Sequence, residues 1–117
     1  MMTLKDLAND IQQNLENWEI PFMNFVDNFR RYKDPRCIEA PSDSINEKLD
    51  ALIASMVEYL CNEQGMDVPQ WVHQVPSCQK PWFVSGRENL KAIALAESPL
   101  EFRIRKIFVL ENFLSRV

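Results

Sequence analysis

Glycine, histidine and threonine are scarce in this chain of 117 residues, and each scarcity argues against a kind of binding site or of secondary structure. The two glycines, Gly65 and Gly86, lie in unrelated contexts, so the chain lacks the glycine-rich loops that bind phosphates or dinucleotides. A single histidine, His73, does not provide the paired, closely spaced ligands typical of a zinc site. One threonine and no long two-residue alternation leave little evidence for β-strands.

Disulfides and membrane-spanning segments are also not indicated. Three cysteines, an odd number, argue against a disulfide framework. The first residues, MMTLKDLAND, are acidic where a signal peptide would be basic, and no apolar stretch approaches the roughly 18 residues that span a bilayer. We therefore expect a cytoplasmic protein with no membrane partner. A content of 46% hydrophobic and 26% charged residues predicts one globular domain over residues 1–117.

The formal net charge of −4 is unevenly distributed along the chain. Residues 1–29 hold one basic and five acidic groups, and residues 41–79 hold one basic and six acidic groups. Residues 30–40 hold four basic and two acidic groups, and residues 80–117 hold seven and four. The overall acidity gives no electrostatic reason for non-specific binding to nucleic acid, although local basic patches are expected.

The spacing of apolar residues predicts an all-α fold, a compact bundle of about five helices with an irregular segment rich in proline and tryptophan. The expected helices span residues 3–18, 21–33, 44–64, 86–97 and 99–116. The last of these is interrupted near 107–109 if Ile107-Phe108-Val109 is extended.

Three serines begin a Ser-x-x-Glu pattern, which is typical of a capped helix N-terminus. They are Ser44, Ser85 and Ser98. Gly65 falls where a left-handed residue would close the third helix. In the fourth helix, the apolar positions Ile93, Ala94 and Leu95 are expected to face inward.

Catalytic, cofactor-binding and metal-binding signals are weak, so we expect no enzymatic activity, no cofactor and no metal. A dyad of Cys78 with His73, or a zinc site that adds Cys37, can be drawn only if these loop cysteines are exposed. Cys61 belongs to an apolar helix face and is expected to be a small buried hydrophobe.

Two basic segments are candidate interaction surfaces. The first contains Arg30, Arg31, Lys33 and Arg36 near the end of a predicted helix, where cations complement the helix dipole or bind a phosphate or an acidic partner. The second contains Arg103, Arg105 and Lys106 between large apolar residues, a pattern shared by amphipathic surface helices and by helices that bind DNA.

Aromatic residues punctuate the second half of the chain. Trp71, Trp82 and Phe83 are either anchors that pack an irregular segment onto the helices or part of a binding surface. The order of Pro69-Gln70-Trp71, Pro81-Trp82-Phe83, a helix ending in Ser98-Pro99, Phe102-Arg103 and Ile107-Phe108-Val109 resembles a segment of small uncharacterised bacterial proteins.

In some of those proteins the segment follows a helix-turn-helix domain, as in antitoxin-like regulators. The resemblance covers residues 68–117 and implies a small bacterial protein with a partner, but no catalytic residues. Residues 1–64 show no corresponding helix-turn-helix pattern. We therefore predict a non-enzymatic protein-interaction or regulatory module that binds a protein partner or itself. The alternative is a nucleic-acid-binding regulator that uses the two basic segments.

Overall fold

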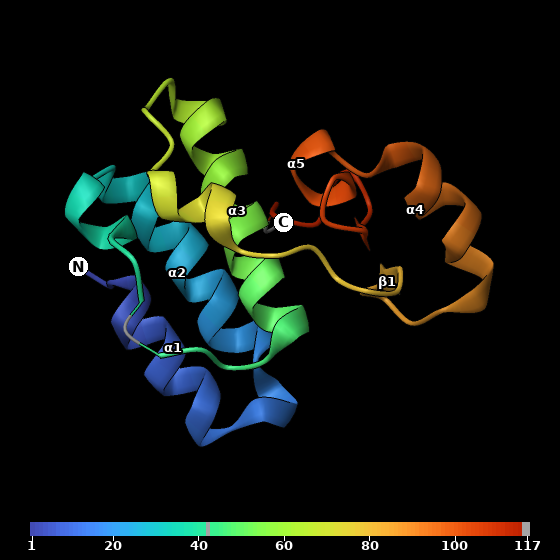
Figure 1. The fold of residues 1–117 in the computed structure, drawn as a ribbon, viewed down its shortest axis with the longest axis horizontal. Helices are drawn as coiled ribbons and strands as arrows, with labels where there is room; N and C mark the ends of the chain where they lie inside the picture. Colours follow the sequence, from blue (N-terminus) through green and yellow to red (C-terminus); the bar gives the residue numbers. More distant parts are fainter. Residues whose placement is uncertain (42, 116–117) are drawn as a thin grey trace.

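The computed structural model describes residues 1–41 and 43–115, which are mostly helical (Figure 1). The α-helices of these residues are α1 (Leu4–Gln13), α2 (Glu19–Tyr32), α3 (Glu47–Gln64), α4 (Lys91–Glu97) and α5 (Leu100–Arg103). Short 3-10 helices span Leu15–Asn17, Pro35–Ile38, Gln70–Gln74 and Glu88–Leu90. Two short strands, β1 (Trp82–Phe83) and β2 (Ile107–Phe108), complete the regular structure of the described part. Within that part, no helix combines the length and the apolar character needed to cross a membrane.

Helices α1, α2 and α3 form the main body, with α3 next to the C-terminal elements (Figure 1). Three aromatic rings of α2, Phe22, Phe25 and Phe29, are fully buried in its core. Nearly every residue of α3 from Leu49 to Val57 is buried, because the helix is covered on more than one side. This all-round burial makes α3 the central element of the fold.

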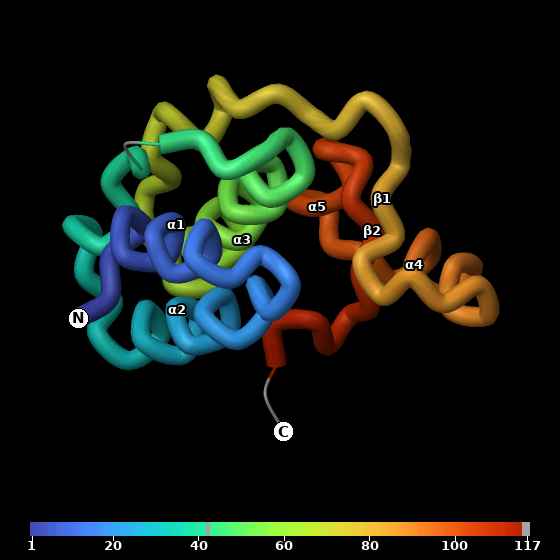
Figure 2. Tube along the Cα trace, turned by 90° about the horizontal axis from the view of Figure 1, so that it is seen from below, coloured from blue at the N-terminus to red at the C-terminus, as the bar shows by residue number. Residues whose placement is uncertain are grey.

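The second half of the chain wraps around α3. The 3-10 helix Gln70–Gln74 and α5 both pack on α3, and β2 contacts α5. Strand β1 pairs with β2 in parallel, with Trp82 opposite Ile107 and Phe83 opposite Phe108. Helix α4 contacts β2 and lies at the far edge of the molecule, away from α1 and α2 (Figure 2).

The predicted helix 3–18 is shorter in the structure. Thr3 caps α1 through its side chain, which accepts from the Asp6 amide, and the Asp6 carboxylate accepts from the Thr3 amide. The helix ends at Gln13 because Asn14 adopts a non-helical backbone, with φ −152° and ψ 81°. Leu15 lies beyond the end of α1 and is 50% exposed. The second helix begins at Glu19, and Pro21 is tolerated because an amide in the first turn needs no intrahelical partner.

The predicted helix 44–64 begins at Glu47, and its cap is Asn46 rather than Ser44. The Asn46 side-chain oxygen accepts a 2.9 Å hydrogen bond from the Leu49 amide. Ser44 instead donates its hydroxyl to the Asp50 carboxylate, which also accepts from the Ile45 amide. The expectation for Gly65 is confirmed, since it closes α3 in the left-handed region with φ 70°.

The all-α expectation is wrong in the last third of the chain. The predicted helix 86–97 becomes the 3-10 helix Glu88–Leu90 followed by α4, without a cap from Ser85. The predicted helix 99–116 stops at Arg103, and its last residue lies outside the described residues. Backbone pairing ends the helix: the Trp82 amide donates to the carbonyl of Lys106, whose φ is 61°. The expected extended segment near Ile107 is confirmed as β2.

The third predicted capping serine, Ser98, is buried and joins α4 to the C-terminal segment. Its hydroxyl donates to the Ile107 carbonyl at 3.1 Å and accepts from the Val109 amide at 3.4 Å. No cap is made to α5 by this side chain. The hydroxyl therefore fixes the end of α4 against the chain that follows β2.

Replacing this buried hydroxyl should destabilise the fold. We expect Ser98→Ala to lower the free energy of unfolding by about 1–3 kcal/mol, because the Val109 amide loses its acceptor and the Ile107 carbonyl loses a donor. Urea denaturation of both proteins measures the difference. Ser85→Ala is the matched control, and its exposed position predicts a change within about 0.5 kcal/mol. Equal midpoints for the two variants would contradict this role of Ser98.

Candidate functional site

The cations of the first basic segment are only partly free. Arg30 on α2 donates from Nε and Nη2 to both carboxylate oxygens of Glu63 on α3, each at 3.0 Å, and from Nη1 to the Leu114 carbonyl. Arg36 pairs with the carboxylate of Asp34 at 2.7 Å, and this pairing lowers the Asp34 pKa to about 2. Two of the four predicted cations thus contact carboxylates of the protein itself.

Arg31 and Lys33 are exposed at the C-terminal end of α2. The Arg31 guanidinium lies 5.4 Å from the centre of the Tyr32 ring. Tyr32, the last residue of α2, is 47% exposed. Lys33 ends α2 with φ 53°, and its amide donates to the Phe29 carbonyl. This arrangement is that of a helix end with cations at the negative pole of the dipole.

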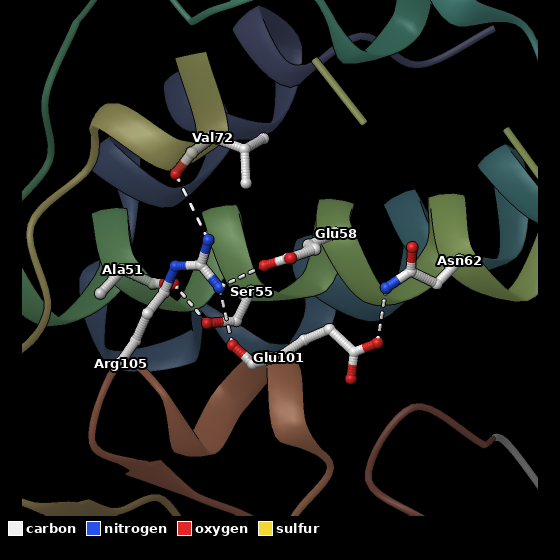
Figure 3. A network of polar contacts seen from close by, with 7 residues as sticks. All are labelled: Ala51, Ser55, Glu58, Asn62, Val72, Glu101 and Arg105. Carbon is white, nitrogen blue, oxygen red and sulfur yellow. Dashed lines mark hydrogen bonds and ion pairs between the residues drawn. The ribbon is translucent and has the colours of Figure 1, made fainter. Parts of the chain in front are cut away.

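Arg105, the central residue of the second basic segment, is buried (Figure 3). Its Nη1 donates to the Glu58 carboxylate of α3 and to the Glu101 carbonyl of α5, both at 2.7 Å. Its Nη2 donates to the Val72 carbonyl at 3.3 Å. The prediction of Arg105 as a surface cation is therefore wrong, because the side chain joins α3, α5 and the 3-10 helix Gln70–Gln74.

The neighbours of Arg105 remain exposed. Arg103 donates to the Ser98 carbonyl at 2.9 Å, and Lys106 reaches the Gln79 carbonyl at 3.5 Å. Both side chains accordingly keep their charge near solvent. The seven predicted cations therefore fall into two groups. Arg30, Arg36 and Arg105 pair with carboxylates of the protein. The other four are exposed beside α2 and α5.

The three predicted aromatic residues are partly buried and mainly pack the irregular segment. The Trp71 indole donates to the Ile38 carbonyl at 2.9 Å, and the Trp82 ring lies 6.1 Å from the Trp18 ring. Phe83 stacks on Phe108 with ring centres 5.1 Å apart. All three aromatic side chains thus make contacts within the protein, which favours the packing interpretation and leaves less of their surface for a partner.

Sequence reasoning missed the largest group of exposed aliphatic side chains. Ile93 and Leu95, both expected to face inward, are 46% and 50% exposed, and Ala94 alone is buried in α4. Leu100 and Ile104, one helical turn apart at α5, are 69% and 53% exposed. We call Ile93, Leu95, Leu100 and Ile104 the α4–α5 surface. The sequence feature that could have indicated this surface is the continuous apolar run around Ala94. Consecutive residues of a helix point in different directions, so the helix cannot bury all of them on one face.

A hollow of about 610 Å³ borders this surface between α4 and the C-terminal segment. Its apolar lining comes from Leu90, Ile93 and Leu110. Tyr59 of α3, Glu97 and Glu111 also line it. The side of α4 that carries Ile93 therefore faces a surface depression that can receive protruding side chains.

A second hollow, of about 300 Å³, lies between α1, α3 and the 3-10 helix Gln70–Gln74. Its lining is largely apolar and includes Ile53 and Trp71, with Asp43 and Asp50 as charged residues. The Asp50 carboxylate is already bonded to Ser44 and to the Ile45 amide. This hollow is therefore small and largely apolar, and the Asp50 carboxylate that lines it is engaged in hydrogen bonds within the protein.

The cysteines are poorly suited to nucleophilic chemistry. Cys37 and Cys78, drawn as exposed loop residues in the dyad and zinc alternatives, are buried together with Cys61. Burial raises the pKa of all three thiols and brings that of Cys61 to about 11. His73 is exposed. Across residues 1–41 and 43–115, no three or more His, Cys, Asp or Glu side chains gather as metal ligands would.

Comparison of the chain with protein-family models, with curated proteins and with solved structures found no match.

Removing the Arg105 side chain should leave an uncompensated charge near the core. We expect Arg105→Ala to lower the free energy of unfolding by about 3–5 kcal/mol, because the Glu58 side chain is only 15% exposed and loses its partner. Thermal or urea denaturation gives the value. Arg103→Ala is the control with an exposed arginine. Replacing both charges in Arg105→Met/Glu58→Met should recover much of the loss. An unchanged free energy of unfolding in Arg105→Ala would contradict a structural role of the Arg105–Glu58 pair.

The buried thiols predict an alkaline loss of stability. Between about pH 9 and pH 11 the Cys61 thiol ionises in the unfolded chain but stays protonated in the folded one. The unfolded state then binds fewer protons, so the free energy of unfolding falls as the pH rises. We expect a smaller fall in Cys61→Ala, measured by urea denaturation from pH 8 to pH 11. An identical pH dependence would contradict a raised pKa for Cys61.

Proposed function

We propose that this protein is a non-catalytic interaction module that binds another protein through the α4–α5 surface. The observation that carries the proposal is the exposure of four large aliphatic side chains within a segment of twelve residues, from Ile93 to Ile104. Burying a leucine or isoleucine side chain contributes about 1.5–3 kcal/mol, so covering these four would drive association. Exposed aliphatic side chains that neighbour each other on a helix, as Leu100 and Ile104 do one turn apart, are typical of a protein-binding site.

The side chains of the α4–α5 surface are not the ones that these helices bury in the core. Ala94 and Phe102 are the side chains of α4 and α5 that are buried against the rest of the protein. Leu100 and Ile104 point away from that contact, as their exposure shows. Their aliphatic character is therefore explained by an external contact better than by packing within the chain.

The charges around this surface indicate the chemistry of the partner. Arg103 and Lys106 are exposed on either side of Ile104 in the chain. A partner that offers an apolar centre with carboxylates at its rim would match both features. An antitoxin-like or regulatory role is the form of this proposal that the resemblance of residues 68–117 favours, with the target protein as the acidic partner.

The structure offers less support for the alternative of nucleic-acid binding. Arg30, Arg36 and Arg105 contact carboxylates of the same chain, so their positive charge is largely compensated locally. Binding through the remaining cations would weaken steeply with added salt. Salt dependence therefore separates the two proposals in one experiment.

The test is to retain partners on the immobilised protein from its native cell extract at low and at high salt. We expect a stoichiometric protein that persists in high salt and is retained at least tenfold less by Leu100→Ser/Ile104→Ser. Tyr32→Ser is the matched control, because Tyr32 is similarly exposed but lies at the end of α2. The control should retain the partner as the wild type does.

Two outcomes would contradict the proposal. Equal retention by the wild type and by Leu100→Ser/Ile104→Ser would place the binding surface elsewhere. Retention of nucleic acid that elutes as the salt concentration rises, with no protein held in high salt, would favour the regulator that binds nucleic acid. Circular dichroism of each variant confirms that loss of binding does not arise from unfolding.

A further inference from the structure

The corner between α1 and α2 carries a second exposed apolar group. Leu15 and Ile20 are 50% and 63% exposed there, because α1 ends at Gln13 and the chain turns before Glu19. Glu16 and Glu19 are exposed beside them. We call these four side chains, Leu15, Glu16, Glu19 and Ile20, the acidic corner.

The acidic corner lies in a stretch with charge of one sign. Residues 6–29 contain five acidic groups and neither lysine nor arginine. Glu16 and Glu19 therefore place two exposed carboxylates beside Leu15 and Ile20, and Arg87 lines a hollow together with Glu19. A surface that binds here needs an apolar centre with cations around it.

The same protein carries a surface of that kind on α5. Leu100 and Ile104 are exposed with Arg103 between them in sequence and Lys106 close by. We call Leu100, Arg103, Ile104 and Lys106 the basic edge; it is the α5 part of the α4–α5 surface. The acidic corner has two aliphatic side chains and two carboxylates, and the basic edge has two aliphatic side chains and two cations. The two surfaces are therefore complementary in charge and in apolar character.

The two surfaces are separated by β1, because Trp82 packs on Trp18 of the corner while its amide donates to the Lys106 carbonyl. The acidic corner is at the lower end in Figure 1, whereas α5 is at the upper right, beyond α3. A chain therefore does not cover its own basic edge with its own acidic corner. The complementary surface is available only on another copy.

We propose that the protein associates head to tail with copies of itself, the acidic corner of one chain docking on the basic edge of the next. This inference rests on the proposed function, because it names a second copy as an occupant of part of the α4–α5 surface. A contact between two different surfaces is heterologous, so each added copy leaves one corner and one edge free. Association then proceeds beyond the dimer as concentration rises, and it weakens with added salt.

Two variants that each block one surface test this arrangement. Leu15→Ser/Ile20→Ser blocks the acidic corner, and Leu100→Ser/Ile104→Ser blocks the basic edge. All four side chains are at least half exposed, so folding should be retained. Sedimentation velocity over a hundredfold concentration range measures assembly. The wild type and the control Tyr32→Ser should pass beyond the dimer at the highest concentration and low salt.

The mixture of the two blocked variants gives the decisive result. Each variant alone should stay monomeric, whereas an equimolar mixture should form a dimer and stop there, because one intact corner meets one intact edge. Corner-blocked protein that dimerises alone would overturn the proposal in favour of a symmetric contact through the α4–α5 surface. A mixture that stays monomeric while the wild type assembles would also overturn it.

The outcome for the wild type separates this inference from the proposed function. A wild type that remains monomeric at every concentration overturns head-to-tail association. If the wild type then retains a different protein that Leu100→Ser/Ile104→Ser does not retain, binding through the α4–α5 surface is still supported. Failure of both experiments would overturn both proposals.

Discussion

The buried guanidinium of Arg105 is the contact on which the second half of this fold depends. A charge removed from water is costly unless it is paired and hydrogen-bonded, and Arg105 meets Glu58, the Glu101 carbonyl and the Val72 carbonyl. These three partners lie on α3, on α5 and in the 3-10 helix Gln70–Gln74 (Figure 3). Elements with little regular structure of their own thereby obtain one defined position on the central helix.

The presence of the first three helices was predictable, although not all of their ends, because the signals of a helix are local. The Thr3 cap of α1, the apolar stripe of α3 and Gly65 at its end each act within a few residues. The last third was not predictable for the opposite reason. The Ser98 hydroxyl resembles a helix cap in sequence, yet it bonds to the Ile107 carbonyl and the Val109 amide, which no short window reveals. Pairing of β1 with β2 likewise overrides the apolar spacing that predicts a helix after Arg103.

The candidate surface was predictable only in part. Sequence identifies cations, but it does not separate those that face solvent from those that pair across the fold, as Arg30 does with Glu63 and Arg105 with Glu58. The exposed aliphatic residues of α4 were assigned inward because a helix of normal length would bury two or three of them. With only seven residues, α4 places one side chain, Ala94, in the core. The shortness of α4 is therefore the physical reason why Ile93 and Leu95 are exposed.

The separation of Arg105 from Glu58 by 47 residues ties folding to the direction of synthesis. When α3 has been synthesised, its Glu58 carboxylate has no partner until Arg105 has also been made. The Glu58 carboxylate must stay hydrated until Arg105 has been synthesised. Arg30 likewise donates to the carbonyl of Leu114, which follows it by 84 residues. The nascent chain can thus gather α1, α2 and α3 early, but the contacts of its second half require the synthesis of Arg105 and Leu114.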